Sequence, residues 1–149
     1  MSQVVASMSP DSGKIRLLAF HHAPKVTDPD PAESLDIHLQ NLPFTGKIKV
    51  TVWKIDSEHC NFWPKWEKDR AERGITDDDY YQSRDQVDPG HALLKAEDIA
   101  FWRSKEREYV GLSKLSEDSV KYYTVDGNRL DLRLELPCFG VAYLEVGLE

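Results

Sequence analysis

Residues 130–136 read Leu130-Asp131-Leu132-Arg133-Leu134-Glu135-Leu136, with a leucine at every second position and a charged residue between successive leucines. Successive side chains of an extended strand point to opposite faces, so this stretch predicts a β-strand with one apolar and one charged face. Such a strand belongs to a sheet that covers a core on one side and meets water on the other.

The same alternation recurs in both halves of the chain, at Leu35 to Leu39 and at Ile48 to Val52. Turn-forming residues separate the apolar runs, and Ser9 to Gly13 is expected to fold Ile15 to His22 back onto Val4 to Ala6. Six or seven short strands predict an antiparallel β-sandwich, a mainly β fold. At the end of the chain we expect an antiparallel meander, whose strands are Val120 to Val125, Leu130 to Leu136 and Val141 to Val146.

A helical insertion, at about residues 57–111, is expected to interrupt this sandwich as a helix-loop-helix type element. Asp56 or Ser57 is expected to cap its first helix, and Pro64 either kinks that helix or opens a second one ending near Gly74. Further helices are predicted to begin at Thr76 and to run from about Lys95 to Glu108, the latter with Ile99, Trp102 and Tyr109 on one face. The whole chain, residues 1–149, is predicted to form a single domain.

Composition narrows the class of partner. With 19 basic and 26 acidic residues, the chain has a net charge of −7 and should be repelled by nucleic acid and by anionic membrane surfaces. No run of about 18 apolar residues is present, and Met1 to Gly13 lacks the features of a signal peptide. The compartment is therefore unknown, and cytoplasmic if the chain is complete. Cys60 and Cys138 are expected to be two free thiols.

No residue pattern points to a catalytic, metal or cofactor site. Asp77, Asp78 and Asp79 are expected to face the start of a helix rather than a metal ion. His21 and His22, as neighbours on a strand, should point to opposite faces, one packed and one solvated. His59 and Cys60 lack a third group that would orient a nucleophile and its base.

Aromatic residues concentrate around the predicted helices. Flat rings of this kind can stack on sugars, and they can equally fill a core between helices and a sheet, which is the interpretation we favour. We accordingly expect Trp66 to pack back on the sheet. The set consists of Trp53, Phe62, Trp63, Trp66, Tyr80, Tyr81, Phe101 and Trp102.

Residues 55–66 resemble a pattern found in the C-terminal region of glycoside hydrolase family 39, which includes β-xylosidases and α-L-iduronidases. That pattern is Ile-Asp-x-x-His-x-Asn-x-x-x-x-Trp, and the chain reads Ile55-Asp56-Ser57-Glu58-His59-Cys60-Asn61-Phe62-Trp63-Pro64-Lys65-Trp66. Two later stretches, Asp126 to Leu132 and Leu136 to Val141, are similar to the closing turn, strand and hairpin of the family. The resemblance runs from about Val4 to Val146.

The resemblance implies a β-sandwich that follows a catalytic barrel and is interrupted by a helix-loop-helix. The acid/base glutamate of the family lies in an Asn-Glu pair on the barrel, and this sequence has no Asn-Glu pair, so no catalytic residue is carried over. We expect a non-catalytic accessory domain that contacts a barrel or self-associates, or alternatively a stand-alone carbohydrate-binding module. Residues for a barrel or carbohydrate contact are His59, Asn61, Trp63, Trp66 and Trp102. An independent small enzyme would need two facing carboxylates in one pocket.

Overall fold

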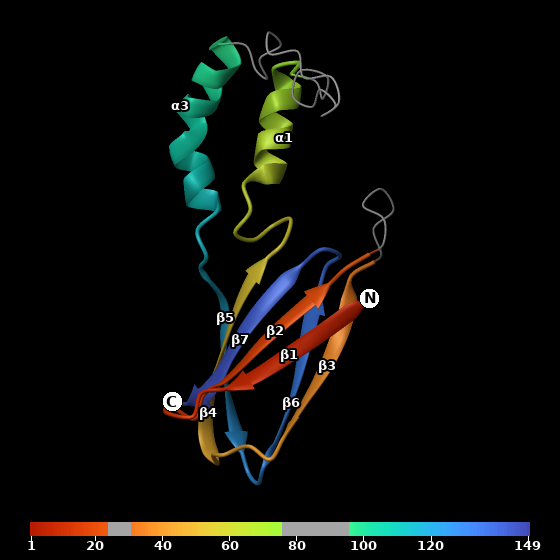
Figure 1. The fold of residues 1–149 in the computed structure, drawn as a ribbon, viewed down its shortest axis with the longest axis vertical. Helices are drawn as coiled ribbons and strands as arrows, with labels where there is room; N and C mark the ends of the chain where they lie inside the picture. Colours follow the sequence, from red (N-terminus) through yellow and green to blue (C-terminus); the bar gives the residue numbers. More distant parts are fainter. Residues whose placement is uncertain (24–30, 76–95) are drawn as a thin grey trace. The chain divides into compact units, whose positions relative to one another are not determined.

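The computed structural model describes residues 1–23, 31–75 and 96–149. These residues form two compact units, one of Met1–Cys60 with Leu115–Glu149 and the other of Asn61–Lys114. The first unit is a β-sandwich and the second is helical, so the predicted mainly β fold with a helical insertion between strands is confirmed (Figure 1).

The sandwich consists of two antiparallel sheets. The larger has five strands in the order β1-β2-β7-β4-β5, and the smaller pairs β3 with β6. The strand bounds are β1 Ser2–Met8, β2 Ile15–His21, β3 Glu33–Gln40, β4 Gly46–Ile55, β5 Glu117–Val125, β6 Arg129–Leu136 and β7 Val141–Leu148.

The core lies between the two sheets and follows the alternation seen in the sequence. On β6 the four leucines are buried and the residues between them are exposed. Leu17 of β2, Ile48 of β4 and Leu144 of β7 close the core from the larger sheet, each at most 2% exposed. Period-two burial therefore holds the sheets together through apolar surface removed from water.

The predicted meander at the end of the chain is wrong. β5 pairs with β4, β6 pairs with β3, and β7 lies between β2 and β4. The chain thus crosses from one sheet to the other at each of its last two turns. Alternating apolar residues specify which face a strand buries, but they do not specify which strand it pairs with. The choice between a hairpin and a crossover therefore depends on long-range pairing.

The β1 and β2 hairpin agrees with expectation. Met8 pairs with Ile15 and Ser2 with His21 around a turn in which Gly13 has a φ of 64°. His21 is buried and His22 is exposed, as predicted for neighbours on a strand. Cys60 and Cys138 are free thiols of intermediate burial.

The helical unit contains α1 Trp63–Glu72 and α3 Ala96–Leu112. Pro64 lies in the first turn of α1, where a backbone N–H would have no acceptor within the helix, so proline loses no hydrogen bond there. Gly74 follows the helix with a φ of 72°. Pro64 therefore opens the helix rather than kinking it. On α3, Tyr109 is buried and Ile99 is 40% exposed, so Ile99 does not share the buried face expected for it.

Trp66 packs in an apolar cluster within the helical unit, and the expectation that it packs on the sheet is wrong. The buried members of this cluster are Trp66, Ile75 and Tyr109, and Phe62, Trp63, Phe101 and Trp102 surround them. Tyr109 donates a 2.8 Å hydrogen bond from its hydroxyl to Asp69, which also contacts Lys65. The aromatic residues thus supply the core that two short helices need.

Asp56 does not cap the first helix. That helix begins at Trp63, beyond a turn that Asp56 organises, and Asn61 accepts a 3.0 Å hydrogen bond from the Trp63 amide at its start. The predicted helix start at Thr76 and the acidic residues Asp77 to Asp79 lie outside the described residues.

Candidate functional site

Asp56 lies at the end of β4 and closes the turn that comes next in the chain. Its Oδ1 accepts hydrogen bonds from the amide of Glu58 at 2.8 Å and from the amide of His59 at 2.9 Å. The same oxygen is 2.8 Å from Nδ1 of His59. An aspartate that binds backbone amides two and three residues ahead forms an Asx-type turn, so the Asp-x-x-His spacing has a local structural cause.

His59 connects this turn to β5, the strand that follows the helical insertion in the sequence. Its Nε2 is 3.3 Å from Oδ1 of Asp118 on β5, and the other oxygen of Asp118 is 3.4 Å from Nζ of Lys54 on β4. The His59 ring thus lies between two carboxylates, those of Asp56 and Asp118. The four side chains form a charged network, the Asp56–His59 site, that links strands β4 and β5.

The electrostatics of the site favour an ionised Asp56. Burial works to raise the pKa of this carboxyl, but the Glu58 amide, the His59 ring and the His59 amide together hold the pKa below its usual value. Asp56 is 7% exposed, so its charge is retained through hydrogen bonds rather than through solvent.

A cavity of about 250 Å³ adjoins the network. Lys54, Asp56 and His59 line it together with Glu58 and with Glu135 of β6. The cavity therefore brings together carboxylates from the ends of β4 and β6, and an independent glycosidase would require such a pair to face one another. In the described part of the chain, no group of three His, Cys, Asp or Glu side chains is placed to hold a metal ion.

The site residues predicted from the sequence fall in both units. His59 belongs to the sandwich, and Asn61, Trp63, Trp66 and Trp102 belong to the helical unit. Trp66 is 0% exposed, and Trp63 and Trp102 are partly buried around the same cluster. A contact of these residues with a barrel or a carbohydrate stays a prediction, although the Trp66 ring has no exposed face with which to make one.

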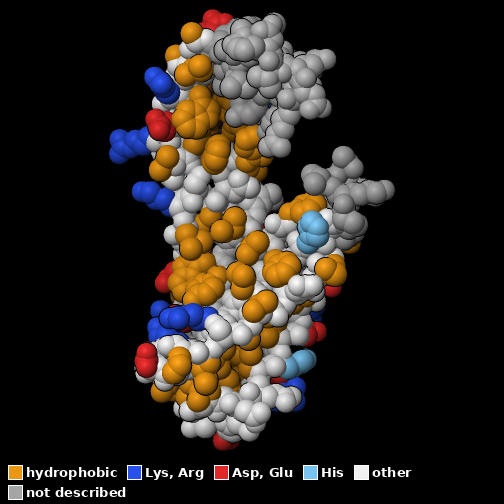
Figure 2. Space-filling model, in the orientation of Figure 1, with side chains coloured by type: hydrophobic (Ala, Val, Ile, Leu, Met, Phe, Trp, Pro, Cys, Tyr) orange, Lys and Arg blue, Asp and Glu red, His pale blue; other side chains and the backbone are white. Residues whose placement is uncertain are grey.

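The sequence patterns did not reveal a second candidate surface, because they assigned each sheet one polar face. Two cross-strand rows of apolar side chains lie on the outer face of the five-stranded sheet, on strands β1, β2, β7 and β4. One row runs along the register Val5–Leu18–Tyr143–Trp53, and the next along Phe20–Val141–Ile55. Figure 2 shows hydrophobic side chains gathered over these strands.

These seven residues together form the outer-face patch. Val5, Leu18 and Ile55 are 57%, 43% and 48% exposed, and the aromatic rings of Trp53 and Tyr143 are 5.3 Å apart. The sequence of β7, Val141–Leu148, contained a signal, because the first two of its outward positions, Val141 and Tyr143, are apolar like its inward ones. Strands with two apolar faces are typical of sheets that are covered on both sides.

A hollow of about 380 Å³ lies at one end of the outer-face patch. Phe20 and Val141 of the patch line it together with Met1, His22 and Phe139. Phe139 has a φ of 61°, a left-handed conformation that bulky residues rarely adopt, and its side chain is 39% exposed. The loop between β6 and β7 therefore holds an aromatic ring at the surface at some conformational cost.

Comparisons with known proteins find similarity through structure alone. No family model and no curated protein matches the sequence. No helix in the described residues is long and apolar enough to cross a membrane.

Solved structures of three glycosidases match nearly the whole chain. The bacterial orthologue of human α-L-iduronidase has a TM-score of 0.64 at 12% identity, covering 99% of this chain and 22% of its own. The GH39 enzyme from Xanthomonas axonopodis pv. citri has a TM-score of 0.58 at 10% identity, covering 99% of this chain and 26% of its own. The β-xylosidase from Caulobacter crescentus CB15 has a TM-score of 0.57 at 16% identity, with 98% and 26% covered.

These identities are low, so the comparison establishes a shared fold. The chain spans about a quarter of the length of the enzymes it matches. Its fold is that of one segment within the chains of GH39 and iduronidase-like glycosidases.

Proposed function

We propose that this chain is a non-catalytic β-sandwich domain of a family 39 type glycosidase, and that it supports a catalytic barrel. Two independent lines support the proposal. The Asp56 and His59 spacing belongs to the pattern that resembles the family, and the fold matches about a quarter of each similar glycosidase chain. The sequence also lacks the Asn-Glu pair expected for the acid/base residue.

The observation that carries the proposal is the outer-face patch. A water-facing sheet surface normally carries polar residues, and contiguous apolar patches of several hundred Å² mark surfaces that another protein covers. In a domain that evolved beside a large barrel, such a surface would be the one that contacts the barrel. The hollow that Phe139 lines, at the end of the patch, would receive an apolar side chain of the barrel.

The proposal predicts that the isolated chain self-associates and binds a dye specific for exposed apolar surface. Leu18→Lys places a charge in the middle of the patch, next to Val5 and Tyr143, and should weaken both effects. Thr124→Lys is the matched control, because Thr124 is exposed on β5 and lies outside the patch. Sedimentation at low and high protein concentration measures the association.

A compact monomer at every concentration, with no dye binding, would contradict the proposed docking surface. Equal behaviour of the Leu18→Lys and Thr124→Lys variants would contradict it as well, because the association would then not depend on the patch. Circular dichroism of both variants checks that the sheet remains folded.

A carbohydrate-binding module is the second candidate, and one observation favours it. Trp53 and Tyr143 lie side by side on the flat outer face, partly exposed, with an angle of 42° between their rings. Aromatic rings on a sheet surface can stack on sugars. Titration with xylan oligosaccharides distinguishes the two functions: saturable binding that Trp53→Ala abolishes supports the module, and no binding supports the domain that docks on a barrel.

A further inference from the structure

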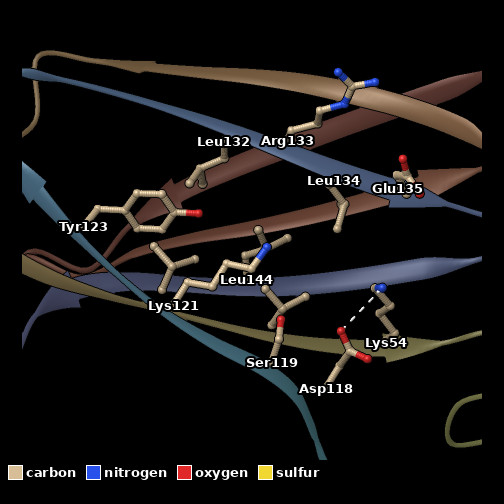
Figure 3. A pocket seen from close by; sticks show the side chains of 12 residues that line it. Lys54, Asp118, Ser119, Lys121, Tyr123, Leu132, Arg133, Leu134, Glu135 and Leu144 are labelled. Carbon is tan, nitrogen blue, oxygen red and sulfur yellow. Dashed lines mark ion pairs between the residues drawn. The ribbon is translucent and has the colours of Figure 1, made fainter.

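A second cavity, of about 480 Å³, lies within the sandwich between β5 and β6 (Figure 3). Its floor consists of inward-facing apolar side chains of the larger sheet, among them Val50, Val52 and Leu144. Its size is within the range of about 300 to 1,000 Å³ that is typical of ligand pockets. The cavity is separate from the outer-face patch, so a molecule bound in it would be a partner in addition to the proposed barrel.

The cavity runs along an open strand edge. It is lined by four consecutive residues of β6, Leu132 to Glu135, and so by inward and outward positions alike, whereas β3 contributes no lining residue. β6 is paired on one side by β3 and has no partner strand on its other side among the described residues. Every second residue of such an edge turns its N–H and C=O groups away from the existing partner.

The two sheets are also unequal in width. Five strands face two, so part of the larger sheet has no strand of the smaller sheet opposite it in the described sandwich. Val50 and Val52 then face the cavity rather than a third strand of the smaller sheet. One further strand beside β6 would cover this floor and satisfy the free edge at the same time.

The charged side chains that line the cavity indicate which residue types an added strand would carry. Figure 3 shows Lys121 reaching from β5 into the cavity beside Leu144, while Arg133 turns away from it. Lys54 is paired with Asp118, but Lys121 has no ion-pair partner in the part of the chain that the structure describes. Glu135 also lines the cavity, but like Arg133 it is at an outward position of β6, whereas Lys121 extends from β5 on the cavity side, and a positive charge there favours an acidic partner.

We propose that an extended, acidic peptide segment binds here as an added strand, pairing with the free edge of β6 and placing a carboxylate opposite Lys121. This is β-strand addition, in which main-chain hydrogen bonds give affinity and alternate side chains give specificity. Apolar residues two positions either side of the acid cover Val50 and Val52. Edge strand β3 of a second copy fits less well, because its inward positions are Leu35, Ile37 and Leu39, none of them acidic.

The test uses two synthetic eight-residue peptides that differ at one position. Both have threonine at outward positions and valine at inward ones, except that a central inward residue is glutamate in one and lysine in the other. Amide chemical shifts of the labelled 149-residue chain report the binding. The glutamate peptide should bind saturably, perturb β6 and β5, and bind at least about fivefold more tightly than the lysine peptide.

Charge reversal supplies the specific control. Lys121→Glu should invert the preference, so that the lysine peptide becomes the tighter ligand. Lys49→Glu makes the same change on β4, but Lys49 pairs with Tyr122 on the outer face, so this variant should keep the original preference. Both variants are expected to fold, because Lys121 is exposed and Lys49 is half-buried without an ion pair in the described residues.

Four outcomes would overturn the inference. One is the absence of saturation by either peptide up to roughly millimolar concentration. Another is a set of shifts confined to the uncharged edge strand β1 rather than to β6. The third is an unchanged preference in Lys121→Glu. The fourth is binding of free glucuronate with no peptide binding, which would assign the cavity to a small anion.

Discussion

Replacement of Trp66 by alanine should unfold the helical unit selectively. Trp66 is 0% exposed and belongs to a cluster whose other buried members are Ile75 and Tyr109. Its ring meets that of Tyr109 edge-on, with the centroids 6.1 Å apart and an angle of 74° between the planes. Trp66 is the only fully buried apolar side chain of α1, because the other buried residue of that helix is Asp69 and Trp63 is only partly buried.

The expected loss depends on the size of the buried ring. Truncation of a buried tryptophan to alanine costs about 3 to 5 kcal/mol, since the transfer free energy is lost and a cavity remains. A helical unit with one small core has little stability in reserve, because even whole domains are stable by only about 5 to 15 kcal/mol. The variant should therefore lose the helical part of its circular dichroism signal at a lower urea concentration than the parent.

Trp53→Ala is the matched control. It removes the same side chain from the outer face of the sheet, where the ring is partly exposed against Tyr143, and should leave the helical transition unchanged. An unchanged helical midpoint in Trp66→Ala would refute the packing of Trp66 as the core of the unit. It would also return Trp66 to the residues that bind a ligand.

Three further outcomes are expected. Lys65 and then Tyr109 bind Asp69 and hold its pKa below the usual value, so its contribution to stability is present above about pH 4 and is lost as the pH falls through the lowered pKa. Asp69→Asn should therefore flatten the acid side of the stability profile, and an unchanged profile would contradict this. Asp56→Ala should cost about 1 to 3 kcal/mol in urea denaturation, because the amides it binds lose their acceptor, whereas Asp56→Asn, which keeps one oxygen, should cost less. Purified chain should hydrolyse no chromogenic glycoside; turnover that disappears in Glu58→Gln or Glu135→Gln, both facing the 250 Å³ cavity, would show an independent enzyme.

The sequence predicted the strands because alternation is a local property. The leucines of β6 are buried at every second position, as Leu130 to Leu136 required, and the turn at Gly13 joins the two strands expected of it. Pro64 and Gly74 marked the ends of α1 for equally local reasons, since one lacks a donor and the other adopts a positive φ.

Local patterns were less informative where two alternatives had the same signature. An aspartate that precedes a helix and an aspartate that closes a separate turn both bind free amides, so Asp56 could be expected in either place. Trp66 was correctly expected to be buried, but the sequence could not say against what. Its partner Tyr109 is 43 positions away and belongs to α3, and only folding brings the two rings together.

The sequence by itself thus determined which residues form strands, which faces of β3, β4 and β6 are buried, and that a helical segment interrupts the sandwich. The tertiary structure decided the strand order, because hydrogen-bond edges carry no sequence label and any strand of suitable pattern can pair with another. It also decided both candidate surfaces. The outer-face patch exists because β1, β2, β7 and β4 align their outward apolar residues in register, and β6 has an open edge because, among the described residues, only β3 pairs with it.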